Sequence, residues 1–253
     1  MSCKASIHLN FLRSEFLNPR FNVSVWHKNI VSRQNKLSQL PFIWNNKEWL
    51  KSTEMEFITD ALQSLCRSES IAALTQDVFV LSDLQVESFL RVSSFEEKCN
   101  KWNKIEQNLW FSDRNHRSPA AKMLFIVNVA SQHWVLIKRT VQTITQIVDW
   151  SLYDSAYSTF KKNSLSKLHQ LIHVVDATTS SDKIKVHIIP CPQQIDTSSC
   201  GRRVGFIAVA EALNIHVNEI CRSLQRTEIL HSFGYRMTML HLTKKWNNFF
   251  WIC

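Results

Sequence analysis

Residues 122–153 read KMLFIVNVASQHWVLIKRTVQTITQIVDWSLY, and this stretch decides the fold. It contains three runs rich in β-branched and aromatic residues, a composition that predicts strands. We expect these strands at Lys122–Ala130, His133–Thr140 and Ile144–Tyr153. Because the gap at 141–143 is short, the second and third strands are expected to form an antiparallel hairpin.

Helical patterns precede this predicted sheet. Thr53 and Glu56 are spaced as a capping box, and apolar residues follow them at helical spacing. Residues 94–109 have their apolar side chains largely on one face of a second predicted helix. These two stretches therefore predict helices before the first strand.

Helices and one more strand follow the hairpin. Leucines and other apolar residues mark a helix at 165–175, and Ile184–Ile189 predicts a strand that prolines end. The run from Val204 is apolar on nearly all sides, which predicts a helix buried inside the domain. Two amphipathic stretches complete the chain, at 217–232 and 235–247. Helices first, then strands mixed with helices, predict an α+β domain.

The composition is that of a folded domain. With 253 residues, 45% hydrophobic and 20% charged, the chain is neither disordered nor collagen-like. Residues 1–40 are polar and aperiodic, so we expect an N-terminal extension of uncertain order there and a compact domain at 41–253. No apolar run suits a membrane span or a signal peptide, and we expect an intracellular monomer in the nucleus or cytoplasm.

The net charge and the cysteine pattern indicate which partners and which metal or disulfide chemistry to expect. The net charge of +9 favours acidic partners, but the basic residues are scattered and no nucleic-acid recognition motif is present. The seven cysteines are odd in number and include no CxxC pair, so we expect reduced thiols. Cys191, Cys200 and Cys221 match no zinc-binding pattern, and no metal or cofactor is expected.

Three residues suggest nucleophilic catalysis. His133 opens one strand of the predicted hairpin and Asp154 follows the other, so the two side chains are expected to meet. Cys200 begins the predicted buried helix, whose N-terminal partial positive charge stabilises a thiolate. Nucleophile, base and orienting carboxylate are the groups that acyl transfer requires. Asp149 is a competing partner for His133, because it also ends an apolar run.

The order of these motifs resembles the ubiquitin-like-specific (SUMO/sentrin-type) cysteine protease family. The segments are Gln132–Ile137 (QHWVLI), Leu152–Ser155 (LYDS) and Pro192–Gly201 (PQQIDTSSCG). Trp49-Leu50 also resembles the Trp-Leu element of that family. The resemblance covers residues 42–250 and is nearest to divergent, transposon-associated members. It implies a papain-like fold of the ubiquitin-like protease type, with a central mixed β-sheet flanked by helices.

The resemblance also implies roles for single residues. His133 would be the general base, Asp154 its orienting partner, Cys200 the nucleophile and Gln194 the oxyanion-hole donor. Trp49 and Trp134 would flank a tunnel for a substrate tail that ends in Gly-Gly. Gly201 would belong to the substrate-binding site, and as one of only three glycines it is expected where the backbone is closely approached. The implied partner is a SUMO-like modifier or its conjugates.

The sequence departs from the family pattern beside the nucleophile. Ser199 stands where the family usually has aspartate, and Arg202-Arg203 interrupt the run from Cys-Gly into apolar residues. Either the helix starts late or these arginines point into the cleft. Three functions follow as hypotheses: a peptidase or isopeptidase, a binding module without turnover, and a nucleic-acid-associated protein.

Overall fold

The computed structural model describes residues 50–66, 78–111 and 122–225. They fall into two compact units. The sheet unit lies within Asp77–Gln193, and the helical unit combines the residues before it with those from Gln194 onward. Trp49, the extension at 1–40 and the helix expected at 235–247 lie outside the described residues.

The sheet unit contains a five-stranded mixed sheet in the order β1-β2-β3-β4-β5. The strands are β1 (Val78–Leu81), β2 (Lys122–Val129), β3 (His133–Val141), β4 (Val148–Tyr153) and β5 (Ile184–Ile189). β2, β3 and β4 are antiparallel neighbours, whereas β1 and β5 pair in parallel with β2 and β4. The four expected strands are confirmed. β4, however, starts at Val148 rather than Ile144, because Ile144 lies in the hairpin turn and is 97% exposed.

The turn from β2 to β3 contains no glycine. Ala130 and Ser131 have φ angles of 54° and 55°, in the left-handed region that glycine usually occupies. The amide of Gln132 donates to the carbonyl of Val129 at 3.2 Å and closes the turn. Left-handed backbone at a non-glycine residue costs about 1 kcal/mol or more, so the turn directly before His133 is strained.

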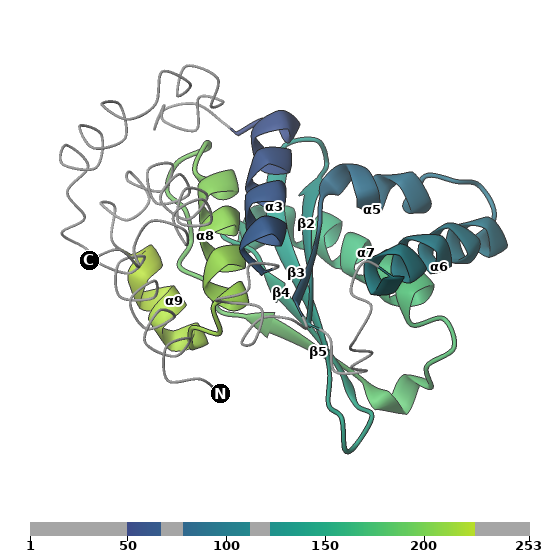
Figure 1. The fold of residues 1–253 in the computed structure, drawn as a ribbon. Helices are drawn as coiled ribbons and strands as arrows, with labels where there is room; N and C mark the ends of the chain where they lie inside the picture. The colour runs from purple at the N-terminus through teal and green to yellow at the C-terminus, as the bar shows by residue number, and fades with distance from the viewer. Residues whose placement is uncertain (1–49, 67–77, 112–121, 226–253) are drawn as a thin grey trace, which may run out of the picture. The chain divides into compact units, whose positions relative to one another are not determined.

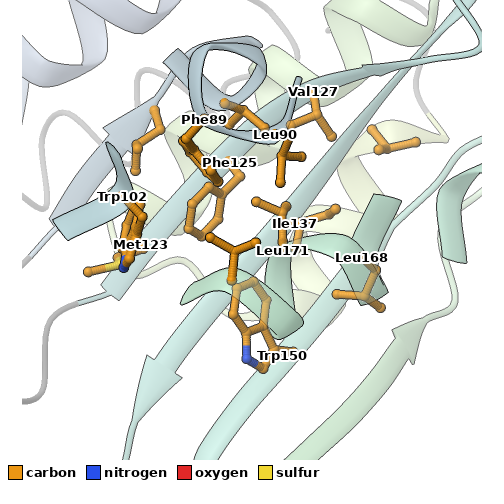
Figure 2. Packing of buried hydrophobic residues seen from close by; sticks show 14 of the residues in the cluster. Phe89, Leu90, Trp102, Met123, Phe125, Val127, Ile137, Trp150, Leu168 and Leu171 are labelled. Carbon is orange, nitrogen blue, oxygen red and sulfur yellow. The ribbon is translucent and has the colours of Figure 1, made fainter. Parts of the chain in front are cut away.

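Three helices cover one face of this sheet: α5 (Asp83–Leu90), α6 (Phe95–Phe111) and α7 (Tyr157–Val175). Figure 1 shows them on the same side of the strands. The alternate strand residues Phe125, Ile137 and Trp150 point into this layer and are fully buried. Figure 2 shows the aromatic rings of the cluster, where Phe125 lies 5.6 Å from Trp150 and 6.2 Å from Trp102 between ring centroids.

A buried ion pair fixes the end of α7. Asp176 caps the helix and accepts hydrogen bonds from Arg139 on β3 at 2.5–3.2 Å. Its second oxygen also accepts from the Trp150 indole at 2.8 Å. Because the Asp176 side chain is 1% exposed, these donors satisfy a carboxylate that could not be buried alone.

The helical unit contains α3 (Ser52–Cys66), α8 (Cys200–Ala212) and α9 (Val217–Leu224). All thirteen residues of α8 are buried, as its apolar sequence predicts. The capping box expected from Thr53 is wrong by two residues, because the amide of Lys51 donates to Glu54 at 2.8 Å and the helix begins at Ser52. No helix within the described ranges has the length and apolar character needed to cross a membrane.

Candidate active site

His133 is the first residue of β3 and is 1% exposed. Its ring stacks on Phe160 of α7, with centroids 4.7 Å apart and planes 12° from parallel. This contact limits rotation of the imidazole. The position of His133 therefore depends on both the strand and the helix packed against it.

The ring of His133 meets Asp154 directly. His133 Nε2 lies 2.7 Å from Asp154 Oδ1, and both side chains are 1% exposed. β3 and β4 are antiparallel, and Leu136 pairs with Tyr153, so the residue after β4 lies near the start of β3. Since a carboxylate oxygen only accepts, Nε2 carries the proton and Nδ1 is the basic nitrogen of the neutral ring.

Further donors hold the carboxylate of Asp154. The Ala156 amide donates to Oδ1 at 2.8 Å, and the Ser164 hydroxyl of α7 donates to Oδ2 at 2.6 Å. The Gln193 side chain donates to the Asp154 carbonyl at 3.3 Å. Hydrogen bonds to both oxygens fix the plane of the carboxylate and therefore the orientation of the imidazole.

The competing residue, Asp149, has other partners. It accepts from Gln142 Nε2 at 2.7 Å and pairs with His187 Nε2 at 3.0 Å on the exposed part of the sheet. Although partial burial raises its pKa, these hydrogen bonds and the nearby charges lower the pKa below its usual value. Asp154, and not Asp149, is thus the carboxylate that contacts His133.

Cys200 lies in the helical unit as the first residue of α8. The residue is buried and its thiol is free. A helix N-terminus carries about half a positive charge, which favours an anion at this position. The first turn of α8 can therefore stabilise a thiolate at Cys200.

Gly201 lies where the backbone is closely approached. A Cβ atom at this position would be 2.9 Å from the Cβ of Leu50, shorter than real Cβ contacts. The expected close approach is present, and it comes from the Trp-Leu element. Leu50 itself is 3% exposed and packs against Gly201 in the first turn of α8.

The remaining predicted site residues, Gln194 and Trp134, lie in different surroundings. Gln194 is half-buried in the loop before α8, and Trp134 is 1% exposed on β3. Trp134 points to the opposite face of the sheet from His133, since successive strand residues alternate. Within the described residues, no three potential ligands gather as a metal site.

The two arginines belong to the first turn of α8, so the helix does not start late. Arg202 and Arg203 are only 3% and 8% exposed. Burial lowers the pKa of Arg202, while the nearby Asp196 and Cys200 oppose that shift. Arg203 donates to Ser199 Oγ at 3.1 Å and to the Leu224 carbonyl at 3.5 Å.

Sequence reasoning missed two residues that support the histidine. Phe160 and Ser164 are four residues apart on α7 and lie on the face that carries Leu168. A serine within an otherwise apolar helical stripe needs a hydrogen-bond partner. The sequence therefore indicated that Ser164 needs a hydrogen-bond partner, but it did not indicate that the partner is Asp154.

The described residues form an α+β domain with a five-stranded mixed sheet and flanking helices. No protein-family model and no curated protein matches the sequence. Solved structures with the same architecture are SUMO proteases. The chain has the fold of the ubiquitin-like-specific cysteine proteases, which confirms the fold that the sequence resemblance implies.

Three solved structures illustrate the likeness. The C-terminal Ulp1 protease domain, in complex with Smt3, the yeast ortholog of SUMO, matches at a TM-score of 0.50 and 14% identity over 84% of this chain and 93% of that chain. Ulp1 with its catalytic cysteine oxidised to a sulfonic acid matches at 0.50 and 15%, over 86% and 94%. A de-sumoylating protease matches at 0.50 and 16%, over 83% and 86%.

Proposed function

We propose that this protein is a cysteine peptidase or isopeptidase that cleaves after the C-terminal Gly-Gly of a SUMO-like modifier. The observation that carries the proposal is the buried His133–Asp154 pair, 2.7 Å apart, with its tautomer set by the carboxylate. A histidine held in this way is prepared to act as a general base. The shared fold and the sequence motif around Cys200 support the assignment of Cys200 as the nucleophile.

The proposed reaction has two stages. His133 Nδ1 takes the proton of the Cys200 thiol, and the thiolate attacks the carbonyl carbon of the terminal glycine. The oxyanion forms near Gln194, whose side-chain amide donates to it; such a donor contributes about 3–4 kcal/mol. When the C–N bond breaks, the imidazolium protonates the leaving amine and a thioester remains. Water then loses a proton to His133, attacks the thioester and releases the carboxylate and the thiol.

The substrate class follows from the proposed tunnel. Trp49 and Trp134 would flank the substrate tail, and only glycine passes between two indoles without a Cβ clash. Support for a SUMO-like partner also comes from the fold neighbour in complex with Smt3. The proposal requires Cys200 Sγ to reach His133 Nδ1 during turnover.

A modifier-binding module without turnover is the second candidate. The observation that favours it is the pair of buried arginines in the first turn of α8, where the family motif has apolar residues. Cations at the positive end of a helix are electrostatically unfavourable for its first turn, so this pair distinguishes the site from the family motif. This candidate predicts binding of the modifier without cleavage.

A vinyl-sulfone probe at the C-terminus of SUMO tests the proposal. We expect the full chain to form a covalent adduct, Cys200→Ala to form none, and His133→Ala to react far more slowly. Cys99→Ala is the matched control, since this half-buried thiol lies on α6, and it should react like the wild type. No adduct with the wild type, or an equal adduct with Cys200→Ala, overturns the peptidase. Calorimetric binding without an adduct supports the second candidate.

A further inference from the structure

Ser82 and Ser199 each directly precede a helix, and the two serines behave differently. Ser82 precedes α5 in the extended conformation, with ψ of 164°, and its hydroxyl accepts from the Gln85 amide at 3.3 Å. Ser199 precedes α8 with ψ of −6°, and its side chain makes no capping hydrogen bond. Serine is a favoured N-cap residue, so its failure to cap at position 199 needs a cause.

Two charged residues hold Ser199 away from the capping geometry. Asp196 Oδ1 accepts the amides of Ser198 and Ser199 at 2.8 and 2.6 Å. The Ser199 hydroxyl accepts from Arg203 Nε at 3.1 Å. The amide of Ser199 is therefore bound by Asp196 and its hydroxyl by Arg203, and neither contact is an N-cap hydrogen bond.

Arg203 is anchored in turn. Its Nη1 donates to the carbonyl of Leu224, the last residue of α9, at 3.5 Å. A cation at a helix C-terminus is electrostatically favourable. The guanidinium thus links the first turn of α8 to the end of α9.

We infer that Asp196 and Arg203 are positioning residues that hold the Ser199 hydroxyl off the first turn of α8, so that this turn stabilises the Cys200 thiolate. A capping hydroxyl would accept the amide of Gly201 or Arg202 and would partly neutralise the field at the thiol. When the hydroxyl does not cap the helix, the amides of Gly201 and Arg202 remain available to stabilise negative charge at its N-terminus. The inference deepens the proposed function, on which it rests.

The rate of Cys200 alkylation by iodoacetamide, measured against pH, tests this inference. Mass spectrometry of the full chain identifies the modified cysteine, and no modifier is needed. We expect Arg203→Gln to slow alkylation near pH 7 and to shift its pH midpoint upward, because the released hydroxyl can cap the helix. Loss of the charge alone also slows the reaction, so the double variant with Ser199→Ala is required.

In the Ser199→Ala background no hydroxyl can cap, and Arg203→Gln should show only the effect of the lost charge. The slowing is expected to be about two- to fivefold larger with Ser199 present than without it, the range for a helix-terminus charge effect. Arg222→Gln, an exposed arginine of α9, is the matched control for charge. Equal slowing in both backgrounds overturns the inference.

Asp196→Ala gives a second route if the loss of buried Arg203 prevents folding. Removing a nearby anion should by itself favour the thiolate and speed alkylation. Release of the Ser199 hydroxyl should slow alkylation. The rate of Asp196→Ala divided by the rate of its parent should therefore be lower when Ser199 is present than in the Ser199→Ala background. The opposite order contradicts the inference. Failure of the SUMO probe with this alkylation pattern intact would refute the proposed function and leave the positioning role of Asp196 and Arg203.

Discussion

The hydroxyl of Ser164 provides a measurable part of the support for the His133–Asp154 pair. Ser164→Ala removes the 2.6 Å hydrogen bond to Asp154 Oδ2, and that side chain is only 1% exposed. A hydrogen bond to a charged group contributes about 1.5–3 kcal/mol, and an oxygen left buried without its donor adds a desolvation penalty. The change removes one oxygen atom, so the cavity contribution is small. We expect the free energy of unfolding to fall by about 2–3 kcal/mol.

Urea unfolding followed by circular dichroism measures this loss. Ser166→Ala is the matched control, because Ser166 is an exposed residue of the same helix and its hydroxyl accepts from Gln170 at 3.4 Å. Surface changes of this kind stay within about 0.5 kcal/mol. In an Asp154→Ala background, Ser164→Ala should have a much smaller effect, since the partner is gone. Equal losses for the two serines would refute the assignment of Ser164 as a donor to a buried carboxylate.

Three further predictions concern stability. Ala130→Gly should raise the free energy of unfolding by about 1 kcal/mol, because glycine tolerates φ of 54°; an unchanged urea midpoint contradicts the strain. Gly201→Ala should lower it by about 1–2 kcal/mol, since the new Cβ would lie 2.9 Å from that of Leu50; equal thermal melts would show that the contact relaxes without penalty. Asp149 has a pKa below its usual 3.8, so its pairing with His187 stabilises the fold above that value and the contribution is lost as the pH falls through the lowered pKa. Asp149→Asn should therefore reduce stability at pH 6, and this effect should shrink as the pH falls through the lowered pKa; an effect that does not change with pH would contradict the pairing.

The strands of the sheet could be predicted because their residues alternate or run apolar over six or more positions. α5 was missed, although Ser82 and Gln85 have the spacing of a capping box and form one. β1 was missed because a four-residue run, VFVL, is too short to separate from other apolar segments. Short elements depend on their neighbours in space, which local sequence does not specify.

For the candidate site, hairpin geometry brought His133 and Asp154 together, because antiparallel strands place the end of one beside the start of the next. The same reasoning could not choose between Asp154 and Asp149, since the choice depends on the register of the hairpin. The contact from Arg203 to Leu224 spans 21 residues and requires two helices to be packed. No periodicity in the chain encodes such a contact.

The two residues of α7 that touch the histidine and its carboxylate, Phe160 and Ser164, lie on the segment that joins β4 to β5. Parallel neighbours cannot be linked by a tight hairpin, so a long crossover connection is required at this place in the chain, and it contains α7. The residues that support His133 and Asp154 thus lie in a connection that the sheet requires. Insertions that lengthen the polar loop after Asp176 would leave these supporting residues in place, whereas a deletion within α7 would remove the sheet edge and the imidazole support in a single event.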